Sequence, residues 1–171
     1  MNILVFELLL IILTVGVYVF MKRLGYKNTE RKLIILLISA ILFETMTEPL
    51  WSNTGLDSWT YLFRDVSWII SLGWVCIIMI SMMIVDYFLR KTSEVRKFFA
   101  YLALIVGATT IIESILVTSK IRSYAPELLA RTTGINIPVL NLPIEALLVL
   151  TIIGAFVIST YKYINYLFNT R

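Results

Sequence analysis

The sequence predicts an all-α integral membrane protein: a bundle of about five transmembrane helices with a possible parallel internal repeat. Two observations predict this fold class. Of the 171 residues, 59% are apolar and 15% are charged, whereas a soluble domain is nearer half apolar and about a quarter charged. Five apolar runs are also each long enough to cross a bilayer as a helix, which takes about 20 residues. The whole chain, 1–171, is expected to form one membrane domain.

The first helix is expected at 3–21. No basic residue precedes this run, whereas Lys22 and Arg23 follow it. This pattern favours a first span with its N-terminus outside over a cleaved signal peptide, which would begin with basic residues. The other four spans are expected at 32–50, 66–88, 98–119 and 138–161.

The basic residues predict the orientation of these spans. Eleven of the 15 Lys and Arg residues lie at one end of the predicted spans and four lie at the other. Because cytoplasmic loops carry an excess of Lys and Arg, we expect a multi-pass protein of the cell membrane with its N-terminus outside and its C-terminus cytoplasmic. This orientation explains the net charge of +4, and no nucleic-acid partner is expected. The eleven are Lys22, Arg23, Lys27, Arg31, Lys32, Arg90, Lys91, Arg96, Lys97, Lys162 and Arg171, and the four are Arg64, Lys120, Arg122 and Arg131.

The two outer loops, 51–65 and 119–137, are expected to fold over the bundle. Trp59, Tyr61 and Phe63 make the first loop too apolar to be solvated on its own. We expect Trp59 or Tyr61 to pack against the second loop or a partner chain. Trp and Tyr are also typical anchors at the membrane interface, so this cluster is not by itself a ligand site.

Carboxylates within the membrane are the most unusual feature of the sequence. Five glutamates lie 12 to 17 residues from the basic end of their spans, which is about 18–26 Å at 1.5 Å per residue. That depth falls in the outer half of a hydrocarbon core about 30 Å thick. Because a lone charge there is unfavourable, we expect Glu44 and Glu113 to share a polar site, joined by Glu48 or Glu145. The five glutamates are Glu7, Glu44, Glu48, Glu113 and Glu145.

Two plainer interpretations of the glutamates stay open. Glu145 follows Pro143 by two residues, which suits the first turn of a helix, where a carboxylate satisfies free amides. The carboxylates could also pair with Arg64, Lys120 or Arg131 and only hold helices together.

The residue types limit the chemistry. The chain has no histidine, and its single cysteine, Cys76, has no partner for an internal disulfide. Carboxylates alone could bind a hard cation, but no spacing indicates a metal site, so no metal and no cofactor are predicted. A carboxyl group in an apolar setting can act as a general acid.

A faint repeat relates the two halves of the chain. Glu44 aligns with Glu113 at an offset of 69, and "IISLGWV" aligns with "VLNLPIE" at an offset of 70. The repeat units are expected at 32–90 and 98–166, preceded by the extra helix 3–21. Both units run in the same direction, which indicates a pseudo-twofold axis along the membrane normal.

At this point the sequence resembles the membrane-embedded lycopene cyclases and the related carotenoid hydratases. In that family, small helical units end a helix with an acid, continue through a "G-x-W-x-[FY]" loop and begin the next helix with "LPxEE". Residues 44–61 read "ETMTEPLWSNTGLDSWTY" and residues 142–145 read "LPIE". The resemblance implies a helical bundle acting on an isoprenoid. The residues that match the family's motifs are Glu44, Trp59, Tyr61, Pro143 and Glu145. Glu113 is added because the internal repeat aligns it with Glu44.

The sequence also departs from that family. Ala146 stands where "LPxEE" has its second acid, and Gly73-Trp74 stands where the first unit would carry this motif. The chain also has five predicted spans, whereas a fused two-unit cyclase has six or more.

Two functions are ranked nearly level, and whether the protein is an enzyme stays open. One is an isoprenoid-modifying enzyme that protonates an olefin in a dry tunnel lined by aromatic rings. The other is a non-catalytic accessory subunit of a larger membrane complex, and a transporter ranks third. The expected partners are the lipid bilayer, other membrane subunits or an apolar isoprenoid. The candidate catalytic residues are Glu44, Glu113 and Glu145, and the candidate binding residues are Glu48, Trp59, Tyr61 and Arg64.

Overall fold

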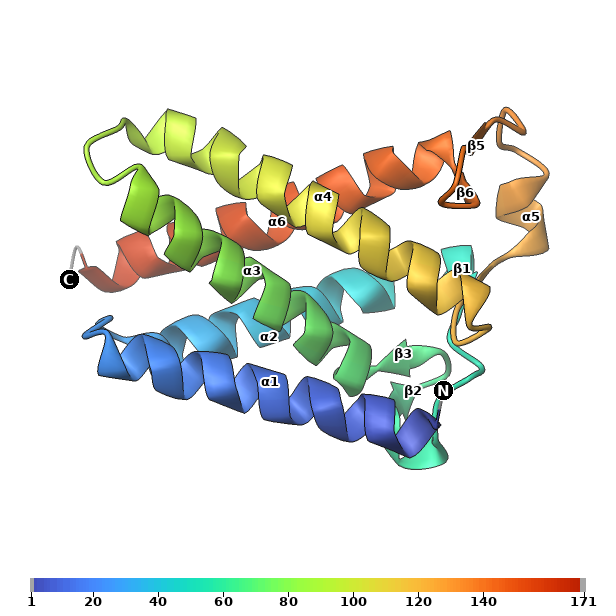
Figure 1. Cartoon of the computed structure of the whole chain (residues 1–171), viewed down its shortest axis with the longest axis horizontal. Coiled ribbons are helices and arrows are strands. Elements are labelled where there is room, and N and C mark those ends of the chain that lie inside the picture. Colours follow the sequence, from blue (N-terminus) through green and yellow to red (C-terminus); the bar gives the residue numbers. More distant parts are fainter. Residues whose placement is uncertain (1, 170–171) are drawn as a thin grey trace.

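The computed structural model describes residues 2–169 and contains five long helices that run alongside one another (Figure 1). All five are long and apolar enough to cross a membrane. The predicted class, an all-α bundle of a multi-pass membrane protein, is therefore confirmed. The long helices are α1 (Ile3–Arg23), α2 (Thr29–Thr47), α3 (Trp68–Phe88), α4 (Glu94–Thr118) and α6 (Ile144–Asn169).

Local signals set the helix boundaries. The side chain of Asn2 accepts a hydrogen bond from the Leu4 amide at 3.1 Å and caps α1. Gly25, with φ +79°, ends the same helix in the left-handed conformation that glycine adopts without strain. The last span begins at 144 rather than at the expected 138. Leu142–Pro143 forms a strand instead, and the preceding Asn141 has a positive φ that no helix contains.

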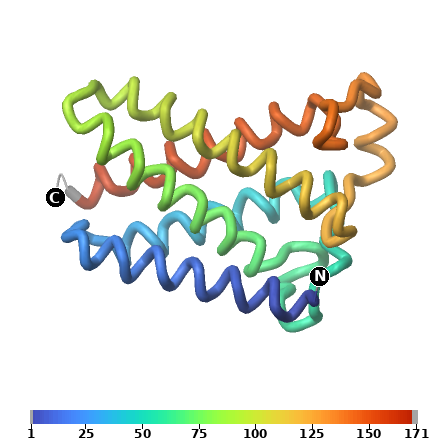
Figure 2. The backbone as a smooth tube through the Cα atoms, in the orientation of Figure 1, coloured from blue at the N-terminus to red at the C-terminus, as the bar shows by residue number. Residues whose placement is uncertain are grey.

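Helix α3 occupies the centre of the bundle. It packs against α1, α2 and α4, and α6 packs against α2 and α4 on the other side. Helix α3 is the most buried span, whereas α1 is the least buried and lies at the edge (Figures 1 and 2). Helices α1 and α4 both contact α3 but hardly contact each other, which leaves room for a groove between them.

The connections at the two ends of the bundle differ. We call the end at which α1 begins the strand end, because residues 48–67 and 119–143 form short paired strands there (Figure 1). We call the opposite end, with the turns 24–28 and 89–93, the turn end. The strand end comprises η1 (Glu48–Leu50), β1 (Trp51–Ser52), η2 (Ser58–Thr60), β2 (Tyr61–Phe63), β3 (Val66–Ser67), β4 (Ser123–Tyr124), α5 (Pro126–Leu129), β5 (Asn136–Ile137) and β6 (Leu142–Pro143).

The two long connections are joined to each other. Strand β1 pairs antiparallel with β4, so that Trp51 lies opposite Tyr124. Strands β2 and β3 pair within the first connection, and β5 and β6 pair within the second. The loops therefore cover the bundle, as expected from their apolar content.

The order of elements occurs twice. Apart from the additional turn η1 after α2, the order helix, strand, short helix, strand pair and helix occurs from α2 to α3 and again from α4 to α6. This order parallels the repeat units 32–90 and 98–166, with α1 as the additional helix.

Candidate functional site

The chain turns sharply where α4 ends, and this turn directs Arg122 back into the bundle. The Lys120 amide donates to the Val117 carbonyl at 3.1 Å, and the Ile121 amide donates to the Leu116 carbonyl at 3.0 Å. This pattern is the Schellman motif, and it places Lys120 in the left-handed region at φ +59°. Arg122 follows at once and is only 2% exposed.

The guanidinium of Arg122 joins Glu44 of α2 to Glu113 of α4. Its Nη1 lies 3.2 Å from Oε2 of Glu113, and its Nη2 lies 3.5 Å from Oε1 of Glu44. Both carboxylates are buried, and Glu44 also accepts a hydrogen bond from the Ser71 hydroxyl of α3 at 3.2 Å. The Arg122 cation thus links α2 to α4, and Glu44 joins them to α3. We call Arg122, Glu44 and Glu113 the charged triad.

The first outer loop completes the surroundings of Arg122. The Arg122 Nε donates to Oδ1 of Asn53 at 2.7 Å, and the guanidinium carbon lies 4.7 Å from the centre of the Trp51 ring. Asn53 is itself held, because its side-chain amide donates to the Asp65 carbonyl at 2.6 Å and its own carbonyl accepts from the Tyr61 hydroxyl. The first loop therefore orients the cation that the second loop supplies.

The triad keeps its cation charged. Burial opposes the charge on Arg122, but the neighbouring Glu113 and Glu44 outweigh it and raise the pKa of the guanidinium above its ordinary value. Burial also raises the pKa of the Tyr124 phenol, and the nearby Glu113 carboxylate adds to this effect.

The net charge of the triad favours one bound proton. One guanidinium and two carboxylates carry a net charge of −1. A single proton on either carboxyl makes the triad neutral, which is the cheaper state inside a membrane.

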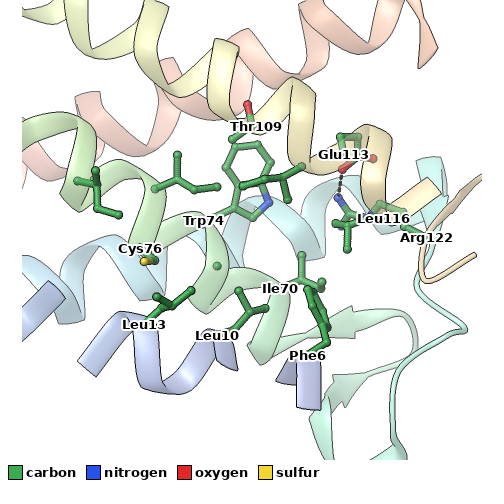
Figure 3. Close-up of a pocket in the computed structure, with 14 residues that line it drawn as sticks. Phe6, Leu10, Leu13, Ile70, Trp74, Cys76, Thr109, Glu113, Leu116 and Arg122 are labelled. Atoms are coloured by element: carbon green, nitrogen blue, oxygen red, sulfur yellow. Dashed lines mark hydrogen bonds and ion pairs between the residues drawn. The ribbon is translucent and has the colours of Figure 1, made fainter. Parts of the chain in front are cut away.

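An apolar groove of about 190 Å³ begins at the triad. It runs between α1, α3 and α4, and Glu113 and Arg122 line one end of it (Figure 3). The remainder of the lining is almost entirely hydrocarbon and aromatic, with Trp74 along its length. Glu44 belongs to the triad but does not line the groove. The labelled apolar lining residues are Phe6, Leu10, Leu13, Ile70, Trp74, Cys76 and Leu116.

The expectation that Glu48 or Glu145 would join Glu44 and Glu113 is wrong. Glu48 lies 3.8 Å from the exposed Arg64, an ion pair outside the triad. The carboxylate of Glu145 accepts a hydrogen bond from the Thr133 amide at 2.7 Å. That bond connects α6 to the preceding loop. Glu145 does lie in the first turn of α6, as the plainer interpretation has it, but this amide belongs to the loop and not to the helix. The structure therefore brings two of the three candidate catalytic glutamates together and leaves the third apart.

The candidate binding residues also separate. Trp59 packs edge-on against Trp68 with ring centres 5.4 Å apart, and it is nearly half exposed. The second loop pairs with Trp51, which lies opposite Tyr124. Packing of Trp59 or Tyr61 against a partner chain stays a prediction. Tyr61 contacts the site indirectly, because its hydroxyl bonds the backbone of the residue that orients Arg122.

The fifth glutamate, Glu7, connects α1 to the first loop. Its carboxylate is fully buried and accepts a hydrogen bond from the Asp57 amide at 2.7 Å. Glu7 lies outside the triad. The five glutamates that the sequence places at a similar depth along their helices therefore bind different partners in the fold.

Sequence reasoning missed Arg122, which is the centre of the site. It counted this residue only as a basic residue of the outer loop and considered Arg64, Lys120 and Arg131 as partners. The available signal was local, since Arg122 lies nine positions after Glu113 and just beyond the end of the same helix. Asn53 and Trp51 carried no such signal, because a loop fold brings them to the site.

Comparison of the chain with protein-family models, with curated proteins and with solved structures found no match.

Proposed function

We propose that this protein takes an apolar isoprenoid chain into the α1–α3–α4 groove and acts on it with the Glu113 carboxyl group. The observation that carries this proposal is the pairing of one ionisable end, Glu113 and Arg122, with an otherwise apolar groove. A groove of about 190 Å³ holds one end of an isoprenoid chain rather than the whole chain, and its composition suits a reactive double bond placed at the charged end.

The chemistry is an acid-catalysed cyclisation or hydration. Protonated Glu113 donates its proton to one carbon of a carbon–carbon double bond, and the other carbon becomes a cation. In cyclisation a second double bond attacks this cation, and a neighbouring carbon then returns a proton to the Glu113 carboxylate. In hydration a water molecule adds and releases the proton instead. Both reactions balance without an oxidant or a cofactor.

Three parts of the site support this chemistry. The triad takes up one proton to become neutral, and Glu113 is the carboxyl of the triad that lies at the groove. Trp74 offers an aromatic face that stabilises a nearby cation. The hydrocarbon lining keeps water from capturing that cation early.

We also propose that the strand end faces the outside and the turn end faces the cytoplasm. Ten of the eleven basic residues on the predicted cytoplasmic side lie at or near the turn end, and the eleventh, Arg171, lies outside the described residues. The charged triad and the groove would then open in the outer half of the membrane.

A cell that accumulates lycopene, a linear polyene, provides the test. We expect the purified wild-type protein to carry the polyene and the cells to form a cyclised isomer of unchanged mass or a hydrated product. Glu113→Gln should still bind the polyene but form no product, because an amide donates no proton. Glu145→Gln is the matched control, because it removes a carboxylate that lies outside the triad and the groove, and it should retain activity.

Two results would contradict the proposal. One is a protein that neither binds nor converts the polyene. The other is equal loss of product in Glu113→Gln and Glu145→Gln, which would show that the loss does not depend on the carboxyl group at the groove.

A second candidate, the accessory subunit, is favoured by the outer face of α1. A shallow hollow of about 530 Å³ lies there around Gly16, and a side chain at that position would meet no atom within 4 Å. Small residues allow membrane helices to approach closely, so a helix of another subunit fits this hollow. Gly16→Leu should then release a co-purifying membrane protein, whereas Gly107→Leu, which also faces open space on α4, should not.

A further inference from the structure

Two exposed residues mark the place where the groove opens. Leu13 of α1 is 47% exposed and Ile112 of α4 is 38% exposed, whereas every other residue that lines the groove is buried or only partly exposed. The two belong to helices that hardly contact each other, although both pack against α3. The groove therefore opens between Leu13 and Ile112, which we call the rim pair (Leu13 is labelled in Figure 3).

The rim pair lies well inside the membrane-spanning helices. Leu13 is the middle residue of α1, and Ile112 lies more than one turn before α4 ends at Thr118. At this level of a transmembrane helix, an exposed Leu or Ile side chain faces lipid hydrocarbon, which is as apolar as the side chain itself. A molecule that passes between the rim pair therefore comes from the hydrocarbon layer and not from water.

The groove is shorter than the chain it is proposed to hold. Its lining follows α3 from Ile70 to Ile80, which is about 15 Å at 1.5 Å per residue. A linear isoprenoid of several units is longer than this. The buried Glu113 and Arg122 close the strand end of the groove, so the remainder of a bound chain leaves through the opening at the rim pair.

We propose that the substrate enters the groove sideways from the bilayer, end first, between Leu13 and Ile112, while the rest of the chain stays in the lipid. This inference rests on the proposed function and defines the substrate class more closely. The substrate is a lipid-soluble isoprenoid with one free hydrocarbon end, whatever group the other end carries. Because only the entering end contacts the protein, the site selects the structure of that end and not the length of the chain.

The first test measures binding of two linear isoprenoids to the full-length protein in lipid nanodiscs. The probes are lycopene and squalene, which differ in length but have the same end group, and we expect them to bind with equal affinity. The double variant Leu13→Trp/Ile112→Trp should weaken binding of both probes about tenfold, because two indole rings obstruct the opening. These positions are exposed, so the larger side chains do not disturb the core.

The matched control places the same rings beside the opening. Leu9→Trp/Ile111→Trp changes residues of the same two helices that are at least half exposed and do not line the groove, so it should leave binding unchanged. Equal affinities of the two double variants would overturn the entry route, even if the wild-type protein forms a product. Binding that depends on the rim pair without any product would contradict the proposed reaction and leave the entry route intact.

Photoreactive derivatives of geranylgeraniol locate the two ends of a bound chain. A diazirine at the hydrocarbon end should cross-link to the part of α3 that contains Ile70 and Trp74, which line the groove. A diazirine at the hydroxyl end should cross-link to lipid instead. Cross-linking of the hydroxyl-end probe to this part of α3, or absence of any cross-link from either probe, would also overturn the proposal.

Discussion

The Nη2 of Arg122 lies 3.5 Å from Oε1 of Glu44, a residue 78 positions earlier in the chain. The contact exists because the second outer loop carries the arginine over the end of the bundle and the first loop holds it there. Strand pairing between β1 and β4, which places Trp51 opposite Tyr124, is therefore part of the site.

Removing the cation of the triad should destabilise the fold. Arg122→Gln leaves Glu44 and Glu113 buried without their shared partner, and breaking a buried ion pair in this way costs about 3–5 kcal/mol. Arg64→Gln is the control, because that arginine is exposed and its pair with Glu48 is worth under about 1 kcal/mol. Thermal unfolding in detergent measures both variants. Replacing Arg122, Glu44 and Glu113 together by Gln should recover part of the loss, and equal stability of the two single variants would contradict the assignment.

The loops meet at Gly55, and a larger residue there should separate them. A Cβ at Gly55 would lie 2.6 Å from the Ile121 Cα and 2.7 Å from the Lys120 carbonyl oxygen, both of which are backbone atoms. Gly55→Ala should therefore displace the turn that carries Arg122 and cost about 1–3 kcal/mol. Gly107→Ala adds the same methyl group where nothing lies within 4 Å. Protease cleavage in the loops should rise for Gly55→Ala alone; unchanged protection would show that the loops tolerate the methyl group.

Stability should fall at alkaline pH partly through Tyr124. Burial and the Glu113 carboxylate raise the pKa of this phenol in the folded protein, whereas an unfolded tyrosine ionises near its ordinary pKa of about 10. The folded state therefore holds the proton more tightly. This contribution is fully present below about pH 10 and is lost as the pH rises towards the folded-state value. Tyr124→Phe should flatten the decline of the unfolding temperature above about pH 10, and the exposed Tyr163→Phe should not. Parallel curves for both variants would argue against the predicted environment.

The proposed orientation predicts which loops are accessible from outside an intact cell. In a Cys76→Ala background, Ala130→Cys places a thiol at the strand end and Lys91→Cys places one at the turn end, both at exposed positions. A membrane-impermeant maleimide should label position 130 in intact cells and position 91 only after permeabilisation. The reverse pattern would mean that the charged triad lies in the inner half of the membrane.

The helices could be predicted from the sequence because their signals are local. Runs of apolar residues of membrane-spanning length, capped by residues such as Asn2 and Gly25, specify a helix whatever its neighbours are. The depth of Glu44 and Glu113 follows from the same counting. Where a strand replaced the expected helix, at Leu142–Pro143, the positive φ of Asn141 reflects a hairpin that apolar character does not reveal.

The sequence by itself determined the five spans, the layer in which the glutamates lie and the basic asymmetry of the two ends, because each depends on composition and on a fixed rise per residue. Only the tertiary structure decided which glutamates meet. Glu44 and Glu113 face a shared arginine, whereas Glu48 and Glu145 face other partners at a similar depth. The reason is that depth is a property of one helix, but proximity depends on helix rotation and on loop pairing. Those are set by contacts between residues as far apart in the chain as Arg122 and Glu44.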